Sequence, residues 1–331
     1  MNNSRRKTPW EFAEQKTPIQ QFLTDQYESR YKERHPAIKE TGEERIINSV
    51  ALFNCPYCTS KAFRKFGKTG NGVQRYRCND CCRTFTPITG TIFDNHKIAI
   101  SEWIEYCLNL FRYLSVTADS WNNRNALTTS RYWLEKLFLI LDGYETDIVL
   151  EGRVWFDETY YTVRCDEIKL KPDGTKPRGL SENQMCVGVA CTKDQIICLL
   201  EGKGQPTARK SYMAFKDHIA PGSTLVHDKG KVHGLLIDKL KLVDEAYDGN
   251  EIKKLSDADN PLCRVNEVHA RLKNFLYAHN SFERTSMQGY LNLFSFVMNP
   301  PSNHLEKVEL LLNRAFLTRK MLRYRSFYNV F

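Results

Sequence analysis

The sequence predicts an α/β protein in which a small cysteine-rich domain and a helical region precede a larger domain built around a β-sheet. Five of the 11 cysteines fall within residues 55–82, and apolar residues recur at helical spacing from residue 99. Segments rich in aromatic and β-branched residues, typical of strands, begin at residue 152. We expect a charged extension, the cysteine-rich domain, the helical region, the sheet domain and a basic helical tail at residues 1–50, 51–97, 98–147, 148–300 and 301–331.

Length and composition set the class of protein. A chain of 331 residues with 41% hydrophobic and 12% aromatic residues is long and apolar enough for two or three folded domains. No apolar run approaches the roughly 20 residues of a membrane span, and the basic start "MNNSRRKTPWEF" has no apolar signal core. We therefore expect a cytoplasmic protein with no membrane association. The net charge of +9 is compatible with a polyanionic partner but does not identify one.

The clustered cysteines form two CxxC pairs, "CPYC" at 55–58 and "CNDCC" at 78–82, with 19 residues between them. This spacing is typical of a tetrahedral Zn²⁺ site, and a structural ion would supply much of the folding free energy of so small a segment. A disulfide pair is the alternative, which a reducing compartment disfavours. Cys82 competes with Cys81 but breaks the two-residue spacing, so the predicted ligands are Cys55, Cys58, Cys78 and Cys81.

The same segment is strongly basic. Seven basic residues and one acid lie between positions 61 and 83, and "RYRCNDCCRTF" alternates arginines with aromatic residues. Groups that neutralise phosphates and groups that stack on bases are what a nucleic-acid contact uses, although a solvated charged hairpin would look similar. The residues predicted to contact double-stranded DNA here are Lys61, Arg64, Lys65, Arg75, Arg77 and Arg83.

Residues 99–113 and a segment from about Thr128 or Thr129 are predicted helices. The first places its apolar residues on one face, which we expect to be buried: Ile100, Trp103, Ile104, Cys107, Leu108 and Phe111. Two helices joined by a short turn fit a helix-turn-helix, but an ordinary helical linker fits almost as well. In the first case the second helix would present outward Ser130, Glu135 and Arg131, the last of these to DNA.

The sheet domain begins with "GRVWFDETYYTV", a predicted strand that carries Asp157. "MCVGVACT" and "QIICLLEG" are two further strands, and "TARKSYMAFKDHI" is a helix. The strand in "STLVHDKGKVHGLL" ends at Asp228, "KLVDEAY" is another strand, and a helix starts near Cys263. Three strands, a helix, a strand, a helix, a strand and a closing helix is the order of a ribonuclease-H-like domain.

In that fold neighbouring strands can bring Asp157 and Asp228 together. An aspartate inside an apolar strand is unfavourable unless it is paired or bound to metal. A carboxylate pair supports phosphoryl transfer by two Mg²⁺ or Mn²⁺ ions roughly 3.5–4 Å apart. Glu158 alternates to the opposite face, where we expect solvent. The alternative is that both aspartates are turn or cap residues of a non-catalytic sheet.

Four segments, taken together, resemble a known family. They are "RYRCNDCCRTFTPITGTIFDNHKI" at 75–98, "WFDETYY" at 155–161, "VHDKGKVH" at 226–233 and "NEVHARLK" at 266–273. The chain resembles the zinc-ribbon DDE insertion-sequence transposases of bacteria, relatives of the eukaryotic Merlin transposons. The resemblance implies that Asp157 and Asp228 bind the catalytic metals. It also implies that His233 positions water or phosphate, although a plain surface histidine is nearly as consistent.

The family's third ligand, Glu in some branches and Asn in others, precedes a lysine by seven residues; counting back from Lys273 gives Asn266. At about 100° per residue, Asn266, His269 and Lys273 share one flank of the helix, with the first and last about 20° apart. Glu267 falls on the other flank. Both observations favour Asn266 over Glu267 as the third ligand, with Lys273 placed to contact a DNA phosphate.

The resemblance implies a DNA transposase that binds terminal inverted repeats, cleaves at the element ends and joins the freed 3′-hydroxyls to target DNA. It further implies a homo-oligomer assembled on DNA, and hence association with the nucleoid. Two alternatives remain. Asn266 in place of an acid would suit a catalytically inactive, domesticated DNA-binding regulator. A stand-alone ribonuclease-H-like DNA nuclease would use the same carboxylates without the end-binding parts.

Overall fold

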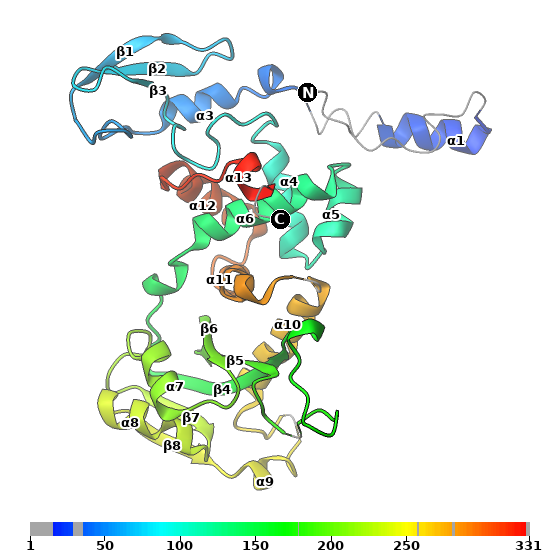
Figure 1. Cartoon of the computed structure of the whole chain (residues 1–331), viewed down its shortest axis with the longest axis vertical. Helices are drawn as coiled ribbons and strands as arrows, with labels where there is room; N and C mark the ends of the chain where they lie inside the picture. The colour runs from blue at the N-terminus through cyan, green and yellow to red at the C-terminus, as the bar shows by residue number, and fades with distance from the viewer. Residues whose placement is uncertain (1–15, 29–35, 178, 257, 280–281, 329–331) are drawn as a thin grey trace. The chain divides into compact units, whose positions relative to one another are not determined.

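The computed structural model describes residues 16–28, 36–177, 179–256, 258–279 and 282–328. The chain forms two compact units (Figure 1). The first contains the described residues up to Ile140 and those from Asn303, and the second contains Leu141–Ser302. The mixed α/β architecture expected from the sequence is confirmed. None of the helices in the described ranges combines the length and the hydropathy of a membrane span.

A three-stranded antiparallel sheet lies in the first unit, with strand order β1 (Phe63–Lys68), β2 (Gln74–Cys78) and β3 (Thr84–Phe85). One ring from each strand contributes to a cluster of three aromatic side chains, whose centroids lie 5.5–5.8 Å apart. The buried side chains of this small core are few: Cys55, Cys78 and Phe85. So small a core supports the expectation that this segment needs a further stabilising element.

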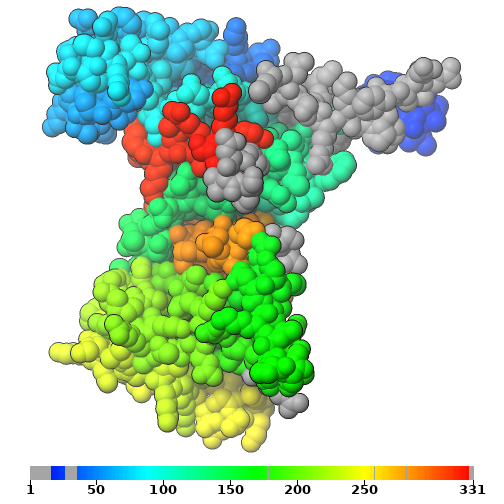
Figure 2. Space-filling model, viewed as in Figure 1, coloured from blue at the N-terminus to red at the C-terminus, as the bar shows by residue number. Residues whose placement is uncertain are grey.

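The rest of the first unit is helical. Its main helices are α3 (Glu43–Ser49), α4 (Glu102–Phe111), α5 (Val116–Asn122), α6 (Leu127–Leu141) and α12 (His304–Leu317), with short α1 (Pro18–Leu23) and α13 (Tyr324–Tyr328). Trp103 of α4 stacks on Trp133 of α6 with centroids 4.6 Å apart. The C-terminal segment packs into this unit, where α12 contacts α4, and Figure 2 shows its red surface among the green and cyan of these helices.

Two details of this region differ from the sequence predictions. In α4, Ile104 is exposed while Tyr106 and Leu110 are buried, because the Tyr106 hydroxyl donates to the Ser130 carbonyl at 2.7 Å and turns that face toward α6. The second predicted helix begins at Leu127, and Ser130 is completely buried rather than presented outward. Its hydroxyl donates to Asp119 at 3.0 Å. Arg131 is exposed, as expected.

The second unit is built on a five-stranded sheet of order β6-β5-β4-β7-β8. The central strand β4 (Arg153–Thr162) pairs antiparallel with β5 (Gln184–Cys191) and parallel with β7 (Thr224–Asp228). The outer strands are β6 (Ile196–Lys203) and β8 (Val243–Tyr247). The helices are α7 (Ala208–Phe215), α8 (Gly234–Leu240), α9 (Gly249–Ile252), α10 (Cys263–Ala278) and α11 (Met287–Met298). Strands and helices follow one another in the order expected from the sequence, except that the short α9 lies between β8 and α10.

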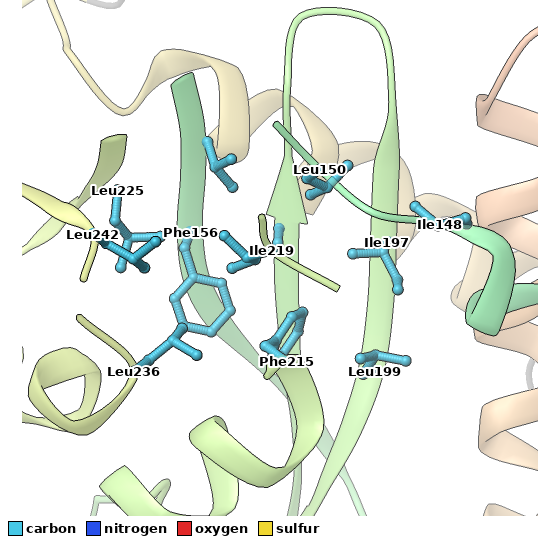
Figure 3. Close-up of a cluster of buried hydrophobic side chains, with 12 residues drawn as sticks. Ile148, Leu150, Phe156, Ile197, Leu199, Phe215, Ile219, Leu225, Leu236 and Leu242 are labelled. Atoms are coloured by element: carbon cyan, nitrogen blue, oxygen red, sulfur yellow. The ribbon is translucent and has the colours of Figure 1, made fainter. Parts of the chain in front are cut away.

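Both faces of the sheet are covered. On one face Phe156 of β4 packs against Phe215 of α7 with centroids 4.7 Å apart, and Leu236 of α8 joins the same cluster (Figure 3). Successive residues of a strand point to opposite faces, so Asp157 lies on the other face, which α10 covers. Because both faces are covered, a polar side chain on β4 costs free energy unless it has a hydrogen-bond or ionic partner.

Candidate functional site

The four predicted cysteine ligands come together in the first unit. Their sulfur atoms lie within 4.8 Å of one another, with Cys55 and Cys81 Sγ atoms 3.7 Å apart and Cys58 and Cys78 Sγ atoms 3.5 Å apart. Four thiolates at about 2.3 Å from a tetrahedral ion lie about 3.8 Å from one another. The cluster could therefore hold a metal ion. Cys82 is exposed and lies outside it, and all four cysteines are free of disulfides.

A backbone N–H supports a thiolate in this cluster. The N–H of Cys81 points at the Cys78 sulfur over 3.5 Å, and this contact lowers the pKa of Cys78 to about 7. A lower pKa increases the fraction of the thiolate form, which is the form that binds metal.

The basic residues predicted to contact DNA lie around the small sheet. The guanidinium groups of Arg75 and Arg77 lie 5.7 and 5.5 Å from the ring centre of Phe66, and that of Arg83 lies 5.1 Å from the ring of Tyr57. Both rings are themselves exposed. Lys61, Arg64 and Lys65 are exposed as well. The surface thus combines cations with aromatic faces, the combination that binds the backbone and the bases of nucleic acids.

In the second unit, Asp157 and Asp228 are neighbours. The parallel pairing of β4 and β7 places Trp155 opposite Val226, and two residues further the same register sets Asp157 beside Asp228. Burial raises the pKa of Asp157 to about 7, and the negative charge of Asp228 adds to this effect. The ammonium group of Lys273 partly offsets it. Two carboxylates in this arrangement attract a cation.

Asp228 is the last residue of β7, and its position is fixed by a tight turn. Its Oδ1 accepts the N–H of Gly230 at 3.1 Å and lies 3.6 Å from Nε2 of His233. The contact with the His233 ring holds the pKa of Asp228 below its usual range. A Cβ atom at position 230 would lie 2.8 Å from that same Oδ1, so only glycine fits without moving the carboxylate.

Helix α10 places some of the predicted residues next to Asp157 and not others. His269 Nδ1 lies 3.8 Å from Asp157 Oδ2, and the positive charge of Lys273 lowers the pKa of the same carboxylate. Asn266 is exposed one turn earlier on the same flank; within the described ranges no hydrogen bond joins it to either aspartate. Glu267 forms ion pairs with Arg264 at 3.1 Å and Arg271 at 2.5 Å on the other flank.

One expectation about this site is wrong. The sequence predicts Glu158 in solvent, yet its side chain is 8% exposed and its Oε1 lies 3.8 Å from Nδ1 of His233. The reason is that α7 and α8 cover the face to which it alternates. Burial raises the pKa of Glu158 to about 8, and the charge of Glu201 on β6 contributes.

Sequence reasoning missed two residues that the fold brings near the site, His227 and Glu201, and it placed His269 on the correct flank of its helix without giving it a role. One signal was available, because strands that pair in parallel are usually covered on both faces. Every polar residue of β4 and β7, including His227 next to Asp228, is therefore a candidate for a residue of the functional site.

Comparisons with known proteins give a limited match. No protein-family model matches the chain. An uncharacterised protein in the transposable element ISH50 of Halobacterium salinarum is 39% identical over 83 residues, which cover 23% of this chain. Those residues are 27% of the relative's length, so the match spans about a quarter of that protein.

Among solved structures, a chain of a pre-cleavage Mos1 transpososome aligns with 64% of this chain and 75% of its own length. The identity is 9% and the TM-score 0.27. A TM-score of this size does not establish a common fold.

Proposed function

We propose that this protein is a DNA transposase that binds the terminal inverted repeats of a mobile element and catalyses metal-dependent strand cleavage and strand transfer. The observation that carries the proposal is the pair formed by Asp157 and Asp228 on adjacent parallel strands, on the face covered by α10. The sheet order and the succession of helices support the ribonuclease-H-like domain expected from the sequence. The partial likeness to a protein of a transposable element supports the same class.

The residues divide the work as follows. Asp157, Asp228 and Asn266 would hold two Mg²⁺ or Mn²⁺ ions, which activate the attacking oxygen and stabilise the leaving one. The donor set fits, because Asp157 is a partly buried carboxylate beside a second carboxylate and a bound cation would favour its charged form. Lys273 is exposed on the same side and can contact a DNA phosphate. His233, whose Nε2 lies 3.6 Å from Oδ1 of Asp228, would position water or a phosphate beside that carboxylate.

The first unit would supply recognition of the element ends. We infer that Cys55, Cys58, Cys78 and Cys81 hold a structural Zn²⁺, which fixes the small sheet and its basic surface. Lys61, Arg64, Lys65, Arg75, Arg77 and Arg83 then contact DNA, and Arg131 extends the contact from α6. Cleavage at both ends of an element implies that more than one copy of the chain assembles on DNA.

A second function is favoured by one observation. Asn266 is exposed, and an amide oxygen binds Mg²⁺ more weakly than a carboxylate. A regulator that binds element ends without cutting them would tolerate this residue.

The test is cleavage of a labelled DNA fragment that carries the inverted repeat bordering this gene, in Mg²⁺ or Mn²⁺. We expect the wild type to cut at the repeat, and Asp157→Asn to reduce the rate by about 10³-fold, equivalent to about 4 kcal/mol. Asn266→Ala should cause a smaller loss. Asp194→Asn, an exposed carboxylate of the same unit, is the matched control and should cut normally. Tight binding without cutting in either metal favours the regulator, and cutting without dependence on the repeat favours a nuclease.

The zinc assignment has its own test. Cys55→Ser should release the metal, measured by elemental analysis, and abolish binding of the repeat. Cys82→Ser, which removes an exposed neighbouring thiol outside the cluster, should do neither.

A further inference from the structure

Two buried histidines lie at the carboxyl end of β7. His227 is 3% exposed and His233 is not exposed at all, and their ring centres lie 4.7 Å apart. A ligand atom from each of His227, Asp228 and His233 lies within 4.8 Å of the other two. Because Asp228 ends its strand, its carboxylate is accessible both to Asp157 and to these rings. The two imidazoles belong to neither the cysteine cluster nor the pair of aspartates.

These rings have nitrogen atoms that nothing satisfies. Nδ1 of His227 and both ring nitrogens of His233 are buried without a hydrogen-bond partner among the described residues. A buried polar atom left without a partner is unfavourable, and such atoms in a folded protein usually have a ligand, an ion or a functional role.

Each ring has a carboxylate near one of its nitrogen atoms. Nε2 of His227 lies 2.9 Å from Oδ1 of Asp244 on β8, which leaves Nδ1 as its free nitrogen. Nδ1 of His233 faces Oε1 of Glu158 at 3.8 Å, and its Nε2 faces Asp228. Histidines that bind metals almost always present their other nitrogen to a carboxylate, carbonyl or water, which fixes the tautomer and makes the ligand more basic. His227 has that arrangement, whereas the Glu158 carboxylate lies near Nδ1 of His233 beyond hydrogen-bond distance.

We propose that His227, Asp228 and His233 form a binding site for a divalent transition-metal ion. Two nitrogen ligands and one carboxylate suit Zn²⁺, Co²⁺ or Mn²⁺, whereas Mg²⁺ prefers oxygen ligands throughout. The site is separate from the cysteine cluster, and it shares Asp228 with the site proposed for catalysis. It depends on coordination chemistry alone, so it holds whether or not the protein cleaves DNA.

The experiment is a Co²⁺ titration of the full-length protein in excess Mg²⁺, with Zn²⁺ retained in the cysteine cluster. Visible absorption of Co²⁺ reports its ligands, and thiolate ligation would add near-ultraviolet bands that imidazole and carboxylate ligation lacks. We expect one equivalent of Co²⁺ that excess Mg²⁺ does not displace and that shows no thiolate bands. His227→Ala and His233→Ala should abolish it.

Those two variants remove buried side chains and can therefore disturb folding. A third variant, at an exposed position, keeps the test independent of folding. The Asp244 side chain is 55% exposed, so Asp244→Asn should fold normally and weaken Co²⁺ binding by about 10–100-fold. Asp157→Asn should leave Co²⁺ binding in place. His279→Ala is the matched control, since it removes another buried imidazole of the same unit whose ring nitrogens also have no partner within the described ranges.

Absence of the Mg²⁺-resistant equivalent in the wild type would overturn the proposal, as would binding that Asp244→Asn and His227→Ala leave unchanged. The outcome is separable from the proposed function. Co²⁺ bound as expected by a protein that never cuts DNA would retain the site and reject the transposase. Normal cutting without bound Co²⁺ would do the reverse.

Discussion

Asp119 in the first unit is completely buried and Asp157 in the second is partly buried, with its side chain 26% exposed, and their surroundings differ. The Asp119 carboxylate accepts hydrogen bonds from Asn109 at 2.9 Å, Asn123 at 2.8 Å and the Ser130 hydroxyl at 3.0 Å. The Asp157 carboxylate accepts the N–H of Glu158 at 2.9 Å and lies beside a second carboxylate. In the first arrangement three side chains of the protein donate hydrogen bonds to the carboxylate. In the second the carboxylate has one backbone donor and can still bind a ligand.

The difference predicts opposite effects on stability. Asp119→Ala should lower the free energy of unfolding by about 3–5 kcal/mol, because the donors that connect α4, α5 and α6 lose their shared acceptor. Asp157→Asn should raise it by about 1–2 kcal/mol at pH 8 without Mg²⁺, because it removes a charge that burial disfavours. Urea denaturation followed by tryptophan fluorescence and far-ultraviolet circular dichroism measures both. Destabilisation of similar size by the two changes would contradict the comparison.

The second prediction concerns pH. Burial raises the pKa of Asp119 to about 6, although its three donors oppose the shift. Between about pH 4 and pH 6 the folded protein therefore retains a proton that the unfolded chain releases, so this residue lowers stability as pH rises through that window. We expect a contribution of about 1–3 kcal/mol.

Urea denaturation of wild type and Asp119→Asn at pH 4.5 and pH 7 isolates this contribution as the difference between their pH slopes. Asp80→Asn, at an exposed position, is the control and should keep the slope of the wild type. If Asp119→Asn keeps that slope as well, the carboxylate is charged throughout and the prediction fails.

The same comparison explains what sequence could and could not predict. The cysteine spacing and the succession of strands are local patterns, and they led to the four-sulfur cluster and to Asp157 beside Asp228. The burial of Glu158 depends on α7 and α8, which lie more than forty residues away in the chain and cover a face that no local pattern reports.

Basic residues of the C-terminal segment illustrate the same limit. From the sequence alone, Arg314 and Arg319 look like residues of a tail that binds a polyanion. In the structure Arg314 donates to the Ile140 carbonyl at 2.7 Å, and Arg319 donates to the carbonyls of Pro87 and Thr89 at 2.8 and 2.7 Å. Their partners are backbone atoms far away in the chain, so only the folded structure reveals this role.

Gly230→Ala should separate activity from stability. Its added Cβ would lie 2.8 Å from Oδ1 of Asp228, and a short, half-exposed side chain can move aside with little loss of stability. Displacing that carboxylate should reduce cleavage by about tenfold, or about 1.4 kcal/mol, with a stability change below about 0.5 kcal/mol. Gly234→Ala is the matched control, because a Cβ there meets no atom within 4 Å. Equal activity of the two variants would show that the position of Asp228 is not critical.

The smallest effect is expected for Glu267, whose carboxylate resembles that of Asp119 in having its partners within the protein. It is 46% exposed and pairs with Arg264 and Arg271 on the flank of α10 that faces away from Asp157. Exposed ion pairs three or four residues apart contribute about 0.2–0.5 kcal/mol each, so Glu267→Ala should change stability by less than about 1 kcal/mol. Cleavage should be unchanged, whereas Asn266→Ala on the neighbouring flank should reduce it. The reverse result, with Glu267→Ala inactive and Asn266→Ala normal, would mean that a carboxylate already engaged by two arginines turns to bind metal when DNA is present, and that hydrogen-bond satisfaction does not separate structural from functional carboxylates in this protein.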